Sequence, residues 1–164
     1  MGRRSTRENK NIYQTSRENM GLTRDEAGEI MQYVTADRIE KIESEKVYPR
    51  PEEVMAMAEC YKVPGLCNYY CSHECPIGMV HVPEIQPREL SAITLEILSS
   101  LNAMNRERDK LIDITVDGKI TPEEYDDFTQ ISEELKKIAQ SVSALQLWVD
   151  QTIANGQIDP NLKR

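Results

Sequence analysis

Four cysteines and a histidine fall close together near the middle of the 164-residue chain. Cys67, Cys71 and Cys75 are spaced four residues apart, with His73 before the last of them and Cys60 upstream. Residues four apart lie on the same face of a helix, so the first two thiols of this series would point the same way. Three thiolates and an imidazole are a ligand set that zinc accepts. Zinc is therefore a candidate cofactor, with Cys67, Cys71, Cys75 and His73 as its ligands.

The same cysteines allow a second interpretation. Their spacing is not the Cys-x2-Cys knuckle of most zinc modules, and Cys60, Cys67 and Cys71 would also serve as small buried hydrophobic residues along a helix seam. The N-terminus shows no signal peptide, so reduced thiols are expected. Apart from zinc, we expect no cofactor.

The segment from Asp113 to Glu124 has the spacing of an EF-hand loop, with Asp at positions 1 and 5, Gly at 6 and Glu at 12. Thr115 at position 3 is a weaker ligand, and no second loop of this kind is present. These residues also have structural roles, because Asp117-Gly118 makes a turn and Thr121 to Glu124 caps a helix. We therefore interpret the segment as a connection between two helices.

Catalytic constellations are absent from the sequence. His73 and His81 are the only histidines, and neither has a paired acid or nucleophile at a recognisable spacing. There is no glycine-rich phosphate loop and no serine nucleophile elbow. We expect that the protein is not an enzyme.

Caps, prolines and apolar spacing predict helices throughout the chain. Thr23 with Glu26 has capping-box spacing, Thr35 is a second cap, and Pro51 suits the first position of a later helix. Short helices are expected from 11 to 20, after Thr23, after Thr35, from 51 and from 65 to 71. Long helices follow from Leu90, with an apolar heptad seam in the second one. The residues of that seam are Phe128, Ile131, Leu135, Ile138, Val142, Leu145 and Val149.

Two segments of the N-terminal half carry a family resemblance. Residues 19–27 (NMGLTRDEA) and residues 38–51 (RIEKIESEKVYPRP) resemble the signatures of the lambda-repressor-like, or XRE, family of helix-turn-helix transcriptional regulators. The resemblance covers residues 11–70 and implies a five-helix repressor-type domain. With the long helices, the expected fold is all-α: this helix-turn-helix domain followed by a C-terminal antiparallel helical hairpin.

The resemblance implies that the protein binds double-stranded DNA as a transcriptional regulator, with the helix from Thr35 to Glu43 in the major groove. The residues implied in DNA binding are Thr23, Arg24, Thr35, Ala36, Arg38, Lys41 and Lys46. A homodimer through the C-terminal helices would pair two half-sites.

Some residues depart from the family pattern. Asp37 and Glu40 would repel phosphates unless they accept hydrogen bonds from cytosine, and Ser44-Glu45 replaces the common Asn-Gly. The alternative function is a helix-turn-helix scaffold that binds proteins without reading DNA sequence.

Charge is distributed unevenly along the chain, whose net charge is −8. Residues 1–24 hold six basic and two acidic side chains, whereas residues 79–164 hold nine basic and fifteen acidic ones. A basic edge on an acidic chain permits one surface that faces a polyanion.

Domain boundaries follow from these patterns. We expect a flexible basic arm (1–10), the helix-turn-helix domain with the cysteine cluster at its end (11–78), a proline-rich linker (79–88), the hairpin (89–155) and a tail (156–164). No apolar run reaches the length of a membrane span, so we expect a cytoplasmic protein without membrane contact.

Overall fold

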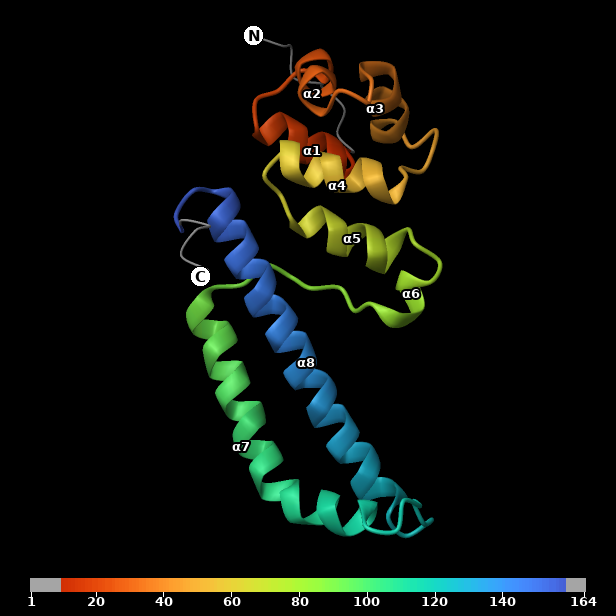
Figure 1. The fold of residues 1–164 in the computed structure, drawn as a ribbon, viewed down its shortest axis with the longest axis vertical. Helices are drawn as coiled ribbons and strands as arrows, with labels where there is room; N and C mark the ends of the chain where they lie inside the picture. Colours follow the sequence, from red (N-terminus) through yellow and green to blue (C-terminus); the bar gives the residue numbers. More distant parts are fainter. Residues whose placement is uncertain (1–9, 159–164) are drawn as a thin grey trace. The chain divides into compact units, whose positions relative to one another are not determined.

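The computed structural model describes residues 10–158, and all regular secondary structure in that range is helical (Figure 1). The expected all-α fold with a pair of long C-terminal helices is therefore confirmed. Residues 1–9 of the expected arm and residues 159–164 of the expected tail lie outside the described residues. The helices are α1 (Ile12–Asn19), α2 (Arg24–Met31), α3 (Ala36–Glu43), α4 (Pro51–Cys60), α5 (Gly65–His73), α6 (Gly78–His81), α7 (Leu90–Thr115) and α8 (Tyr125–Ala154).

The described residues divide into two compact units. The N-terminal unit contains residues 10–85 and 149–158, and the hairpin unit is Gln86–Trp148. Within the N-terminal unit, the side-chain amide of Gln151 donates to the backbone carbonyl of Lys62 over 2.9 Å. The last turns of α8 thus contribute to the N-terminal unit. None of the described helices is long and apolar enough to cross a membrane.

Side-chain caps begin the first three helices. Asn11 accepts a hydrogen bond from the backbone N–H of Gln14, and its own amide donates to the carbonyl of Ile42 at the end of α3. Thr23 forms the predicted capping box with Glu26, and Thr35 caps α3. Each cap satisfies backbone N–H groups that a helix start leaves unpaired, so the ends of these short helices are fixed.

The core of the N-terminal unit consists of apolar side chains from α1 to α5 and the turns between them. Its most buried members include Tyr13, Ala27, Val34, Ile39, Ile42, Val54, Met57 and Leu66. Full burial of one such large side chain contributes about 1.5–3 kcal/mol, so this shared core holds short helices that would not persist alone.

Close packing also places α2 against α3. A Cβ atom at Gly28 would lie 3.2 Å from the backbone nitrogen of Ala36 and 3.3 Å from the carbonyl oxygen of Val34. The backbone therefore approaches α2 at a distance that favours glycine.

A buried ion pair joins α1 to α3. Arg17 Nε and Nη2 donate to the two carboxylate oxygens of Glu43 over 2.6 and 2.9 Å, and Arg17 Nη1 donates to the carbonyl of Leu22. The two side chains are only 7% and 1% exposed. Arg24, at the start of α2, is a second partner of Glu43: its Nε lies 2.9 Å from Glu43 Oε2. Burial opposes the charged form of Arg17, but the hydrogen bonds to Glu43 and the negative charge of Glu43 together outweigh burial and raise the pKa of Arg17.

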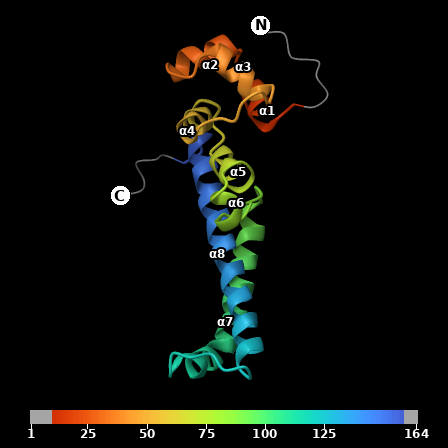
Figure 2. The same cartoon turned by 90° about the vertical axis from the view of Figure 1, so that its right-hand side faces the viewer.

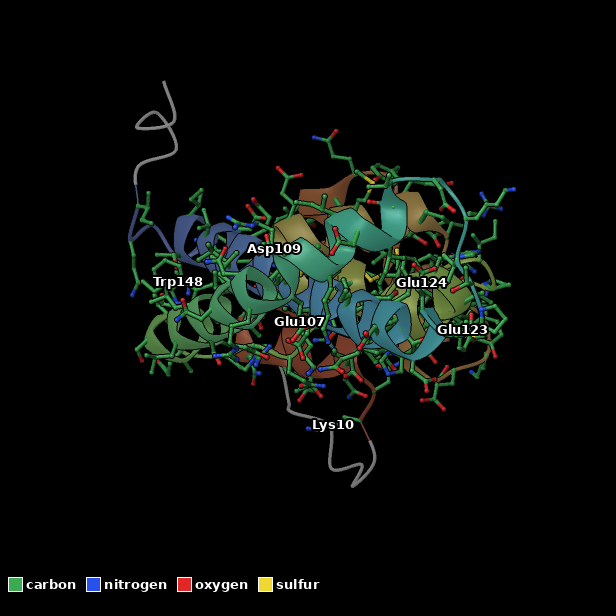
Figure 3. All side chains as sticks on the ribbon, turned by 90° about the horizontal axis from the view of Figure 1, so that it is seen from below. Lys10, Glu107, Asp109, Glu123, Glu124 and Trp148 are labelled. Atoms are coloured by element: carbon green, nitrogen blue, oxygen red, sulfur yellow. The ribbon has the colours of Figure 1, made fainter. Side chains whose placement is uncertain are left out.

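In the hairpin unit, α7 and α8 run antiparallel and side by side (Figures 1 and 2). Lys110 on α7 pairs with Asp127 on α8 over 3.1 Å. The end near the connecting loop is rich in acidic side chains, of which Figure 3 labels Glu107, Asp109, Glu123 and Glu124.

Burial on these two helices differs from the predicted seam. Leu135 and Val142 are 45% and 53% exposed, and Leu101 is also exposed. Ser141, one position away from the predicted seam residue Val142, is buried instead, and on α7 Ser100 is buried beside the exposed Leu101. The hairpin within one chain thus leaves part of the apolar stripe uncovered.

One segment differs from the sequence prediction. The expected linker begins with a helical turn, α6, whose N-terminus at Gly78 packs against the backbone of Cys71. The second long helix begins at Tyr125, directly after the segment from Asp113 to Glu124. Just before this helix, Glu124 accepts a hydrogen bond from the backbone N–H of Thr121.

We predict that Glu43→Gln destabilises the N-terminal unit by about 3–5 kcal/mol, because it leaves the buried Arg17 guanidinium without its counter-ion. Chemical denaturation followed by circular dichroism measures this change. The double variant Arg17→Met with Glu43→Leu should recover most of the loss, since no buried charge remains. Lys136→Ala, which removes an exposed pair in the hairpin unit, should unfold like the wild type. A fully stable Glu43→Gln variant would contradict the role given to this ion pair.

Candidate functional site

The helix that corresponds to the predicted recognition helix presents one side outward. Ile39, Ile42 and Glu43 are buried on its inner side. The outer side, which we call the α3 face, consists of Thr35, Ala36, Asp37, Glu40 and Lys41. Except for Ala36, which is half-buried, all of these residues are exposed. The first requirement for a helix that enters a groove is therefore met.

Arg38, one of the residues implied in DNA binding, pairs with a carboxylate of the neighbouring helix. Its Nε and Nη2 donate to the two carboxylate oxygens of Glu53 on α4 over 2.7 and 2.8 Å, and Nη2 also donates to the carbonyl of Tyr48. The hydrogen bond from Arg38 lowers the pKa of Glu53, and the same bond raises the pKa of Arg38. Arg38 thus links α3 to α4 in this structure.

The other predicted cations also lie beside carboxylates. Arg24 pairs with Glu43, Lys41 pairs with Asp37 over 2.7 Å, and Lys46 lies 3.7 Å from Glu40. The two lysine pairs are exposed, and exposed pairs contribute little and break easily. Six exposed carboxylates accompany the four basic residues between Thr23 and Lys46: Asp25, Glu26, Glu29, Asp37, Glu40 and Glu45.

The two threonines implied in DNA binding, Thr23 and Thr35, act as helix caps. Thr23 Oγ1 accepts from the backbone N–H of Glu26 over 3.2 Å and lies 2.7 Å from the Glu26 carboxylate. Thr35 Oγ1 accepts from the backbone N–H of Arg38 over 3.3 Å. Both residues sit at helix N-termini, where free backbone N–H groups attract anions.

The predicted zinc ligands are spread along α5 and the turn that follows it. Cys75 Sγ accepts from the backbone N–H of Gly78, and His73 Nδ1 lies 3.2 Å from the carbonyl of Tyr69. Burial raises the pKa of the Cys67 thiol, which disfavours the thiolate that zinc requires. Among residues 10–158, no three His, Cys, Asp or Glu side chains are grouped so that they could hold a metal ion. Zinc binding stays a prediction.

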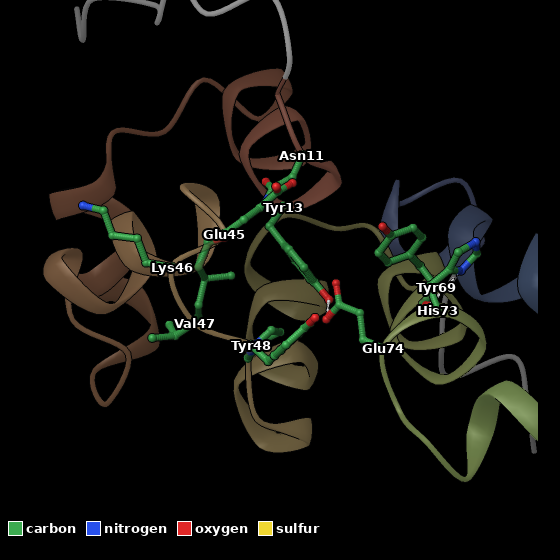
Figure 4. A pocket seen from close by; sticks show the side chains of 11 residues that line it. Asn11, Tyr13, Glu45, Lys46, Val47, Tyr48, Tyr69, His73 and Glu74 are labelled. Atoms are coloured by element: carbon green, nitrogen blue, oxygen red, sulfur yellow. Dashed lines mark hydrogen bonds between the residues drawn. The ribbon is translucent and has the colours of Figure 1, made fainter.

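Sequence reasoning missed a pocket of about 490 Å³ beside α1, α5 and the loop after α3 (Figure 4). Tyr13, Tyr48, Tyr69 and His73 supply aromatic rings to it, and Glu45 and Glu74 supply carboxylates. We call these six residues the aromatic pocket. Their sequence positions span more than sixty residues, so no local spacing signals the site.

A second hollow, of about 570 Å³, lies between α2 and α4. Its rim carries three exposed apolar side chains, Ile30, Tyr33 and Met55. Exposed apolar residues grouped around a groove are typical of surfaces that bind other proteins. We call this feature the α2–α4 groove.

Comparison of the chain with models of protein families, with curated proteins and with solved structures gave no match. The likeness to the lambda-repressor-like family rests on the motifs of this chain alone.

We predict that Arg38→Ala makes the N-terminal unit less stable by about 1–2 kcal/mol at neutral pH, through loss of charge-assisted hydrogen bonds. Because Arg38 lowers the pKa of folded Glu53, its stabilisation exists above the ordinary glutamate pKa of about 4.3 and disappears as pH falls through the lowered value. The difference between variant and wild type should therefore shrink towards about pH 3.

Urea denaturation at several pH values measures this dependence. Lys41→Ala, which removes an exposed pair, is the matched control and should leave stability unchanged. A loss of stability in Arg38→Ala that is equal at neutral and acidic pH would contradict the role of the Glu53 carboxylate.

Proposed function

We propose that the N-terminal unit is the DNA-binding part of a transcriptional regulator and that the α3 face enters the major groove. The observation that carries this proposal is the outward α3 face, held over a buried inner side and flanked by the capped N-terminus of α2. Helix-turn-helix proteins use such a pair, with one helix in the groove and the preceding helix against the backbone.

The ion pairs determine which residues would contact DNA. The exposed Lys41–Asp37 and Lys46–Glu40 pairs would open at small cost and release two lysines for phosphates. Arg38, whose Nε and Nη2 both donate to the Glu53 carboxylate, would support α3 and not read a base. Asp37 and Glu40 would then accept hydrogen bonds from cytosine amino groups. Specific recognition would depend on few phosphate contacts, which gives a shallow salt dependence.

Selection of bound sequences from random DNA, followed by fluorescence anisotropy, tests the proposal. We expect a preferred sequence, with Lys41→Ala weakening all sequences about equally, as loss of a phosphate contact does. Glu40→Gln should change the preferred base at one position. Lys136→Ala, a lysine of the hairpin unit, is the matched control and should bind like the wild type. The absence of any complex that resists competitor DNA would overturn the proposal.

A second candidate function, a protein-binding scaffold, is favoured by the α2–α4 groove and by the excess of carboxylates around α3. If the folded protein selects no DNA sequence, the protein-binding scaffold is the remaining candidate function. In that case, Ile30→Asp and Met55→Asp would each disrupt the protein complex while the unit stays folded, because both side chains are exposed.

We also propose that the protein forms a homodimer in the cytoplasm through its hairpin units. The apolar side chains left uncovered on α7 and α8 support this proposal: Leu95, Leu98, Leu101, Leu135 and Val142. A second copy would bury such stripes, and twofold symmetry would present two α3 faces to paired half-sites.

Light scattering at high micromolar concentration tests dimerisation. We expect a dimer for the wild type and a monomer for Leu135→Glu, because a charge in an apolar interface is desolvated without a partner. Gln140→Glu adds the same charge at an exposed polar position of α8 and should remain dimeric. A wild-type monomer at that concentration would contradict the dimer.

A further inference from the structure

The aromatic pocket has a composition that the proposed DNA contacts do not use. It lies within the N-terminal unit, beside α1, the loop after α3 and α5. Tyr13, which is buried, donates its hydroxyl to Glu74 Oε2 over 3.0 Å at the centre of the pocket. Figure 4 shows Tyr48 directed towards the same carboxylate from the opposite side.

Within the described residues, the two carboxylates of the pocket form no ion pair with a lysine or arginine. Across residues 10–158, neither Glu45 nor Glu74 has a lysine or arginine nitrogen within 4.0 Å. Lys46 belongs to the lining, but its side chain points away from Glu74 (Figure 4) and lies near Glu40. Burial raises the pKa of Glu74 and the charge of Glu45 adds to this effect, whereas the hydrogen bond from Tyr13 and the charge of His73 act in the opposite direction. A bound cation would offset the effects of burial and of Glu45.

The rings of the pocket form a wall that suits the same kind of ligand. Tyr69 stacks on His73 with centroids 4.4 Å apart, and it meets Tyr13 edge-on at 6.2 Å. Tyr48 is 80% exposed, which leaves a large ring free at the rim. Tyrosine faces attract ammonium and guanidinium groups through the ring quadrupole.

The backbone at the rim is also unusual. Glu45 has a φ of 59°, in the left-handed region where a residue other than glycine costs about 1–2 kcal/mol. Glycine would end α3 there without that cost. Gln32 and Lys62, which follow α2 and α4 outside this pocket, also have a φ in this region.

We propose that the aromatic pocket binds a small organic cation, with its ammonium or guanidinium group between Glu74, Glu45 and the tyrosine rings. The alkyl part of the ligand would lie against Tyr48 and Tyr69. An anion is disfavoured by the two carboxylates. A bare metal ion is disfavoured because no three His, Cys, Asp or Glu side chains in the described part of the chain are grouped so that they could hold one. The inference does not depend on DNA binding.

Isothermal titration calorimetry of the full chain tests this site, with agmatine and tetramethylammonium as probes and 1-butanol as a neutral comparison. We expect saturable binding of at least one cation and none of the alcohol. Glu74→Gln and Glu45→Gln should each weaken binding by about tenfold or more, as loss of a charged partner does. Tyr69→Leu should weaken binding through loss of the ring face.

Glu59→Gln is the matched control, because Glu59 is an exposed glutamate of α4 outside this pocket, and it should bind like the wild type. Glu45 is exposed, so its variant keeps the test valid even if Glu74→Gln fails to fold. The proposal is overturned if neither cation binds, if the alcohol binds as well as the cations, or if Glu45→Gln binds both cations with wild-type affinity.

Discussion

The buried contact between Arg17 and Glu43 is the interaction on which the N-terminal unit depends. Glu43 lies on the inner side of α3 and receives guanidinium groups from α1 and from the start of α2. Buried charges are tolerated when they are paired and hydrogen-bonded. The contacts of Arg17 and Arg24 with Glu43 therefore fix how α1, α2 and α3 pack together. The same contact decides which side of α3 remains outside, and thereby places the α3 face and the aromatic pocket.

Pairing of opposite charges continues over the surface of this unit, with consequences for any polyanion that approaches it. Arg38 is held by Glu53, and the exposed lysines lie beside carboxylates on α3 itself. A surface of this kind attracts DNA weakly at long range, because the carboxylate beside each cation cancels most of its electric field. Recognition would then rest on short-range complementarity more than on net charge.

The sequence contains local signals that predict much of the fold. Capping at Thr23 and Thr35 and the first turn at Pro51 depend on neighbouring residues, and the structure has them where they were expected. The candidate site was less predictable. Contacts such as Arg38 with Glu53 and Tyr13 with Glu74 join residues 15 and 61 positions apart. A pattern of spacing along one helix contains no information about such partners, so Arg38 resembled a free base-reading side chain.

The share of α8 in the N-terminal unit affects how the protein emerges from the ribosome. Gln151 is synthesised 89 residues after Lys62, the residue whose carbonyl it binds. Domains generally fold in the order in which they are translated. Here the first unit has to wait for its final segment until the whole hairpin unit has been made. A nascent chain therefore holds α1 to α5 without this last contact, and translation through the hairpin sets the time before the unit is complete.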